Sequence, residues 1–284
     1  MNILDSTIQG VIQGFTEFLP ISSSGHLMIA QYFLGIRENN LFFSISLHIG
    51  TLISVLIVYR KTFLNLIKSA FSLPISILSG RKKTKSESLF INIFVSLVPL
   101  FFLVIPIPQI GSLKEFASYL SGSGNILIVG VSLIVTSILL YLGIKSSDSR
   151  AKYANNEMTP LKAFFIGIFQ MFAGVFPGLS RSGSTLSAGL IMGVDRKEAL
   201  DFSFILGTPT ILVAAIAEFK EVHDLGIKVD LLPLLVGILV SAFVGCLSIN
   251  LFKWLIKNDK TWLFSIYCFV VGSLVVLLKV LRLY

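Results

Sequence analysis

The sequence predicts an all-α integral membrane protein with six transmembrane helices and two re-entrant helical hairpins in inverted-topology repeats. Three observations predict this fold class. Hydrophobic residues make up 54% of the 284 residues and charged residues only 13%, whereas soluble domains contain about 25% charged residues. The mean hydropathy is +0.86, and apolar stretches near the roughly 20 residues that cross a bilayer recur along the chain. Two further apolar stretches are interrupted by proline, glycine and serine.

The first interrupted stretch, residues 6–36, is predicted to be a re-entrant hairpin. Neither of its apolar parts is long enough to span the membrane alone. A helix, a break and a returning helix fit the pattern, and membranes tolerate such a break where the backbone is buried in protein or lines water. Pro20 ends the first helix because proline lacks the amide hydrogen. We expect the second helix to begin near His26.

The second interrupted stretch is residues 161–194, with its break at Pro177-Gly178, and it is also predicted to be a re-entrant hairpin. The remaining apolar stretches are predicted to be full spans. The predicted spans are residues 42–59, 89–107, 125–144, 202–219, 231–252 and 262–281.

The two interrupted stretches are copies in an internal repeat. At an offset of 157 or 158 residues the alignment matches Gly10 with Gly167, Gln13 with Gln170, Pro20 with Pro177, Gly25 with Gly183, Gly35 with Gly193 and Gly50-Thr51 with Gly207-Thr208. The chain is therefore predicted to be one membrane domain, residues 1–284, with repeats over about 1–145 and 160–284. Because three spans separate the copies, the second enters from the opposite face, and the two breaks should meet near the midplane.

The positive charges indicate an orientation. Residues 60–88 carry seven Lys or Arg against one Glu, and residues 145–162 carry four against two acidic residues. Basic connections of membrane proteins lie in the cytoplasm, which places both termini on the outer face. Because this rule accounts for the net charge of +8, nucleic acid is not expected as a partner.

The two breaks carry polar side chains that lipid would reject. They are Gln13, Glu17, Ser22, Ser23, Ser24 and His26 in the first, and Ser180, Arg181, Ser182 and Thr185 in the second. Arginine can bind two phosphate oxygens while hydroxyls and helix N-termini take the others, so a phosphate group is the expected ligand. We expect the breaks to bring Glu17, Ser23, His26 and Arg181 together.

Glu17 indicates catalysis. A carboxylate repels phosphate unless a divalent cation lies between them or unless it acts as a base. His26 can attack phosphorus or carry a proton, and Ser23 can be a nucleophile that His26 assists. The residues favour phosphoryl transfer to water from a lipid substrate. The alternatives are a transporter or flippase of a phosphorylated lipid and, third, a structural or assembly protein.

The chain resembles the undecaprenyl-diphosphate phosphatase family, also called bacitracin-resistance proteins, over nearly its whole length. The motif (Glu/Gln)-x-x-x-Glu matches Gln13 to Glu17, and Pro-x-Ser-Ser-(Ser/Thr)-Gly-His matches Pro20 to His26. Pro-Gly-x-Ser-Arg-Ser-Gly-x-Thr matches Pro177 to Thr185. The resemblance implies an enzyme of the bacterial inner membrane that removes the terminal phosphate of undecaprenyl diphosphate and regenerates the monophosphate carrier for cell-wall precursor synthesis. It also implies Mg²⁺ or Ca²⁺ as cofactor.

The resemblance also implies roles for single residues. Glu17 would be the metal-linked acid, with Gln13 as a weaker second ligand because other members often have Glu there. Arg181 would clamp the phosphate. The expected substrate-binding side chains are Gln13, Ser22, Ser24, Ser180, Ser182 and Thr185.

Two points stay open in the sequence. Either Ser23 or His26 can be the nucleophile, and we expect Ser23 to attack with His26 as general acid and base. His48 stands where the family leads us to expect Gln, so its contribution is open. The sequence also does not decide between a monomer and a homodimer.

Overall fold

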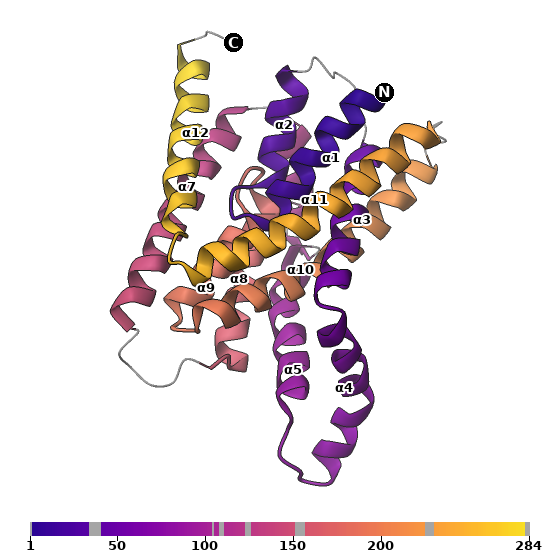
Figure 1. Ribbon diagram of the computed structural model, residues 1–284, viewed down its shortest axis with the longest axis vertical. Coiled ribbons are helices and arrows are strands. Elements are labelled where there is room, and N and C mark those ends of the chain that lie inside the picture. The colour runs from indigo at the N-terminus through magenta and orange to yellow at the C-terminus, as the bar shows by residue number, and fades with distance from the viewer. Residues whose placement is uncertain are drawn as a thin grey trace.

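The protein is a bundle of helices (Figure 1). The computed structural model describes residues 2–33, 41–103, 105–107, 111–122, 126–150, 157–224 and 230–281. The helices are α1 (Ile3–Phe18), α2 (Ser23–Phe33), α3 (Leu41–Val58), α4 (Arg60–Leu78), α5 (Lys85–Leu97), α6 (Leu113–Gly122), α7 (Ile126–Arg150), α8 (Pro160–Val175), α9 (Arg181–Ile191), α10 (Arg196–Asp224), α11 (Leu231–Lys257) and α12 (Trp262–Val280). A 3-10 helix, η1 (Val98–Leu103), follows α5, and the strands β1 (Pro106–Ile107) and β2 (Gly111–Ser112) form a short antiparallel pair.

Five helices in the described part of the chain are long and apolar enough to cross a membrane. They are Lys85–Leu103, Ile126–Ser149, Arg196–Ile216, Leu231–Lys257 and Trp262–Val280. A sixth candidate is the bent pair Ser46–Val58 and Arg60–Leu78, whose axes differ by 84°. The structure therefore has five or six candidate spans. The predicted all-helical membrane class is confirmed, and the two-residue strands are the exception to it.

The chain does not enter a loop after the first predicted span, residues 42–59. It bends at Tyr59 and continues as α4, so much of the expected basic connection, residues 60–88, is helical. The Tyr59 hydroxyl donates a 2.5 Å hydrogen bond to Asp201 of α10, and Lys253 Nζ of α11 lies 3.9 Å from the centre of the Tyr59 ring. These contacts hold the bend against two other helices.

The two predicted breaks are present. After α1 the chain passes through Leu19 in an extended conformation and Ser22 at a φ of 73°, a left-handed value that is uncommon for serine. After α8 the chain turns at Gly178, at a φ of 88°. The returning helix α2 begins at Ser23 and not near His26, because Ser22 caps it: the Gly25 amide donates to Ser22 Oγ at 3.2 Å.

The first helix of each broken pair packs closely against a helix of the other half. Gly10 and Gly14 let α1 approach α11, since a Cβ on Gly14 would lie 2.7 Å from Val244 Cβ. Gly167, the repeat partner of Gly10, lies in the same way against the backbone of Ser96 in α5.

The layout places the breaks inside the bundle. The start of α1 and the end of α12 lie at one end of the molecule, and the hairpin of α4 and α5 projects at the other (Figure 1). Phe18, at the end of α1, is buried and meets Phe204 of α10 edge to face at 5.5 Å. The last residue of α1 is thus held by an aromatic contact directly before the break.

Candidate functional site

A polar pocket of about 200 Å³ lies where the two breaks meet. Its lining comes from α1, α2, α3, α8, α9, α10 and both breaks. The residues are Glu17, Ser22, Ser23, Ser24, His48, Ala173, Leu179, Arg181, Thr210, Ile211, Ala214 and Ala215. The predicted meeting of Glu17, Ser23 and Arg181 is therefore present in the structure.

Glu17 is the centre of the polar contacts in this pocket. The last turn of α1 carries it, and its side chain is only 5% exposed. The Arg181 guanidinium donates to Oε1, the Ser23 hydroxyl donates to Oε2 at 2.7 Å, and Gln13 Nε2 donates to Oε2 at 2.9 Å. A buried carboxylate needs such partners, because transferring an unpaired charge out of water is costly.

Arg181 reaches Glu17 because α10 leaves room for it. Arg181 is the first residue of α9, and its guanidinium lies against the backbone of Gly207. A Cβ at position 207 would overlap the guanidinium nitrogen atoms. Gly207 is the repeat partner of Gly50, but nothing in the sequence showed that it faces Arg181.

The three serines of the first break all line the pocket. Ser22 is buried and its hydroxyl caps α2, whereas Ser24 is exposed. Ser23 is half-buried and is the serine whose hydroxyl contacts Glu17. Both α2 and α9 begin at residues of this pocket, so the positive ends of two helix dipoles lie beside it.

Three hydroxyl residues that the sequence predicted to bind substrate do not line the pocket. Ser180 caps α9 by accepting from the Gly183 amide at 3.0 Å, and Ser182 donates to the Leu19 carbonyl at 3.1 Å. Thr185 lies 2.6 Å from the Ser203 hydroxyl. All three are buried, and Ser180 supplies a partner for a free amide of the first turn of α9. These contacts join the first turns of α9, which begins with Arg181, to the first break and to α10.

His26 does not meet Ser23, contrary to the prediction. Its Nδ1 donates to the Ser22 carbonyl at 2.8 Å, which leaves Nε2, when the imidazole is neutral, to accept from the Tyr267 hydroxyl at 2.8 Å. The two rings stack with centroids 5.6 Å apart. The partner in α12 thus turns the imidazole away from the pocket and into a separate apolar cavity, which Tyr267 also lines.

His48 is the imidazole that the structure places in the pocket. It lies on α3, its Nδ1 donates to the Ser44 carbonyl at 2.8 Å, and its Nε2 lies 3.6 Å from Glu17 Oε2. Its position two residues before the repeated Gly50-Thr51 pair was the signal that could have singled it out.

Two side chains of α1, Glu17 and Gln13, carry oxygen atoms of the kind that a hard cation takes. Among the described residues no group of three His, Cys, Asp or Glu side chains could hold a metal. However, Gln13 Oε1 is buried and has no hydrogen-bond partner in the described part of the chain, and it belongs to the side chain that contacts Glu17. Carboxylate and amide oxygens are the ligands that Mg²⁺ and Ca²⁺ take.

Comparison with known proteins agrees with this picture. A model of the family described as "Bacitracin resistance protein BacA" matches residues 6–274. The undecaprenyl-diphosphatase of Alkaliphilus metalliredigens is 34% identical over 286 residues, which cover 99% of this chain and all of that protein. Undecaprenyl-diphosphatase 4 of Bacillus thuringiensis is 36% identical, with 98% of each chain covered, and the undecaprenyl-diphosphatase of Methanosphaera stadtmanae is 36% identical, with 99% of each covered.

Proposed function

The chain belongs to the bacitracin resistance protein BacA family, and we propose that its polar pocket is where this phosphatase removes the terminal phosphate of undecaprenyl diphosphate. Hydrolysis regenerates the monophosphate lipid carrier for cell-wall precursor synthesis. The observation that carries the proposal is the buried Glu17, which accepts from both Arg181 and Ser23. A hydroxyl, a base and a guanidinium in contact are the parts that phosphoryl transfer needs.

Arg181 binds the terminal phosphate in this proposal. Its guanidinium has five N–H donors in a planar fork, so it can keep its hydrogen bond to Glu17 and still donate to phosphate oxygens. The N-termini of α2 and α9 add amide groups and positive dipole ends on the same side. The charge that develops on the phosphoryl oxygens is thereby stabilised by groups that are already in place.

Ser23 is the nucleophile, and Glu17 is its base. Ser23 Oγ attacks the terminal phosphorus and passes its proton to Glu17 Oε2, 2.7 Å away. The bond from phosphorus to the bridging oxygen breaks, and undecaprenyl monophosphate leaves. Water then attacks the phosphoserine and gives one proton to Glu17, which has passed its earlier proton to His48. The bond from phosphorus to Ser23 Oγ breaks, and the serine and inorganic phosphate are released.

His48 carries protons at this carboxylate. Its Nδ1 is held by the Ser44 carbonyl, so Nε2 points toward Glu17 and the pocket. It can accept the proton from Glu17 and return it to the serine oxygen in the second step. His26 positions the turn of residues 22–24 through the Ser22 carbonyl.

Glu17 and Gln13 are the residues that would hold Mg²⁺ or Ca²⁺. When bound there, the cation supplies positive charge that offsets the repulsion between Glu17 and the phosphate oxygens.

The breaks act as two re-entrant hairpins in inverted repeats, with six spans when α3 and α4 are taken as one. Matched glycines support this arrangement: Gly10 lies against α11 and Gly167 against α5, which are equivalent helices of the two halves. The positive-inside rule then places the basic connections in the cytoplasm and both termini on the outer face of the bacterial inner membrane. A transporter or flippase is not favoured, because it needs no nucleophile beside a base.

The experiment is phosphate release from undecaprenyl diphosphate by the purified protein in detergent, with Mg²⁺, with Ca²⁺ and with chelator. Arg181→Ala is measured beside Arg196→Ala, a matched control whose guanidinium pairs with Asp148 and Asp259 away from the pocket. We expect release that depends on Arg181 and not on Arg196. Tight lipid binding without release by the wild type would favour the carrier.

A further inference from the structure

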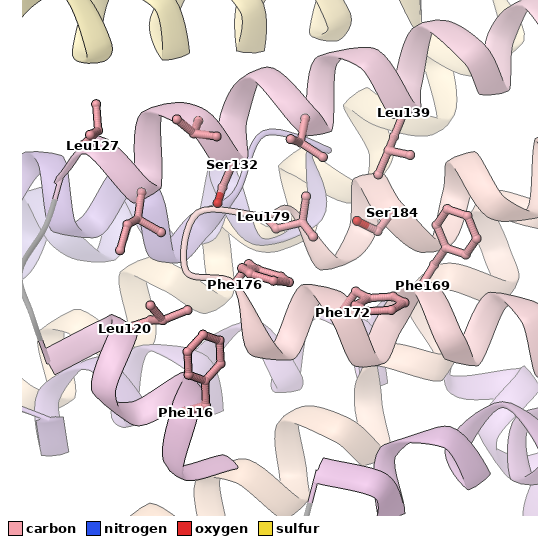
Figure 2. A pocket seen from close by; sticks show the side chains of 13 residues that line it. Phe116, Leu120, Leu127, Ser132, Leu139, Phe169, Phe172, Phe176, Leu179 and Ser184 are labelled. Carbon is pink, nitrogen blue, oxygen red and sulfur yellow. The ribbon is translucent and has the colours of Figure 1, made fainter. Parts of the chain in front are cut away.

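A second cavity, a long apolar groove, runs beside the polar pocket. It has a volume of about 560 Å³, within the range of sites that bind small molecules. Four phenylalanine side chains line it: Phe116 of α6, Phe169 and Phe172 of α8, and Phe176 directly after α8 (Figure 2). Val131 and Val135 of α7 also line it. Phe116, Val131, Val135, Phe172 and Phe176 are exposed, so the groove opens at the surface of the chain.

The groove and the polar pocket share one wall. Leu179, in the second break, lines both cavities. Two neighbouring residues of α8 also lie at this boundary: Phe172 lines the groove and Ala173 lines the pocket. A molecule with a charged head in the pocket and an apolar tail in the groove would therefore cross at Leu179.

Two polar side chains, Ser132 and Ser184, interrupt the apolar wall of the groove. Ser184, one turn into α9, lines the groove beside Leu179 (Figure 2). Its side chain is fully buried, and its hydroxyl has no hydrogen-bond partner among the described residues. A buried hydroxyl without a partner costs about 1–3 kcal/mol, and an ester oxygen at the head of an apolar chain would supply the missing partner.

The internal repeat gives the molecule a second groove to compare. This cavity is lined by the repeat-related residues of α1 and by α12, with Phe15 in place of Phe172 and His26 in place of Ser184. Among the described residues it shares no lining side chain with the polar pocket. Of the two cavities, the groove of α6, α7 and α8 is the one that shares a lining residue with the pocket, so a tail attached to the bound phosphate would enter that groove past Leu179.

We propose that the groove beside Leu179 binds the isoprenoid chain of the substrate next to its diphosphate. The proposal rests on the proposed function, which places the diphosphate in the polar pocket. The groove holds the first isoprene units, and the rest of the undecaprenyl chain continues into the bilayer. It gives the enzyme a preference for long isoprenoid diphosphates over short ones.

The test compares kcat/KM for undecaprenyl diphosphate and for isopentenyl diphosphate, whose tail is a single isoprene unit. Phe172→Ala removes a wall of the groove, and Phe15→Ala removes the repeat-related ring from the other cavity; both rings are partly exposed, at 49% and 38%. The measured quantity is kcat/KM for undecaprenyl diphosphate divided by kcat/KM for isopentenyl diphosphate. We expect Phe172→Ala to lower this ratio about tenfold. Phe15→Ala should keep the ratio within about twofold of wild type.

A second variant tests the groove by filling it. Val131→Trp places an indole ring in the groove from α7 and should lower the same ratio. Melting temperatures show whether each variant is folded. An unchanged ratio in both groove variants would overturn the proposal, as would an equal fall in Phe15→Ala, which would indicate general partition into the lipid.

Failure of the proposed function looks different. The wild type would then release no phosphate from either substrate. In that case, binding of radiolabelled undecaprenyl monophosphate to Phe172→Ala and Phe15→Ala tests the groove without turnover, and weaker binding in Phe172→Ala alone would support it. Equal binding by the two variants would overturn it.

Discussion

The Arg181 guanidinium donates to the Glu17 carboxylate, although the two residues are 164 positions apart in the chain. Arg181 begins the helix after one break, and Glu17 lies in the last turn before the other. Both side chains are largely shielded, at 18% and 5% exposed. This pair joins the two halves of the molecule at the point where the phosphate is proposed to bind, so it has consequences for stability as well as for turnover.

Arg181→Met should destabilise the protein more than Glu17→Gln does. Removing the guanidinium leaves Glu17 buried without its cation, and breaking one side of a buried pair costs about 3–5 kcal/mol. Glu17→Gln leaves no unpaired acid, and Arg181 is the more exposed partner. Melting temperatures in one detergent measure the difference.

The double variant Glu17→Gln with Arg181→Met separates stability from catalysis. Without either charge it should recover most of the melting temperature and stay inactive. Equal melting temperatures for the wild type and Arg181→Met would contradict the ion pair.

Ser23→Ala should lower kcat about a thousandfold or more, because the proposed nucleophile is lost. Ser24→Ala is the matched control: it is the adjacent pocket serine, but its hydroxyl contacts Ser22 and not Glu17. Substrate labelled in its terminal phosphate should leave a trappable phosphoenzyme on the wild type and none on Ser23→Ala. A labelled histidine, or an active Ser23→Ala, would assign the attack to another group.

The sequence predicted the breaks from local chemistry and their meeting point from the internal repeat. Proline and glycine interrupt a helix wherever they stand, and the repeat of Pro20 at Pro177 indicated two equivalent interruptions. Glu17, Ser23 and Arg181 sit next to those interruptions, so placing the breaks also placed these side chains.

The sequence did not predict the direction of side chains that depend on distant partners. Tyr267 of α12 turns His26 away from Ser23, and no pattern links positions that are 241 residues apart. In the same way, the Ser182 hydroxyl donates to the Leu19 carbonyl of the other break and not to the pocket. Tyr59, where the chain bends into α4, contacts Asp201, which is 142 positions away. The sequence therefore indicated a connection where the structure has the helix α4.

His48→Gln should change the pH dependence of turnover, whereas His26→Gln should not. Loss of a general acid and base costs about a hundredfold in kcat, and the limb of the pH–rate profile that depends on the lost group disappears. His26→Gln removes the contact with Tyr267 and should lower the melting temperature. Profiles of kcat against pH for both variants decide between the two histidines. If His26→Gln alone removed a limb, the proton-transfer role would return to His26.

Gly207→Ala should lower kcat without changing any group that contacts substrate. A methyl group at position 207 would overlap the Arg181 guanidinium, so the side chain must leave Glu17 or α10 must shift. We expect kcat to fall about tenfold to a hundredfold, since a misplacement of about 1 Å can cost a hundredfold.

Gly174→Ala is the matched control, because it is also a helical glycine and its nearest neighbour, Leu103 Cδ1, would lie 3.6 Å from the new methyl. That variant should keep wild-type turnover and be as stable or slightly more stable, since alanine favours a helix by about 1 kcal/mol. Wild-type kcat in Gly207→Ala would show that Arg181 can work from another position, and the clamp would then not depend on its contact with α10.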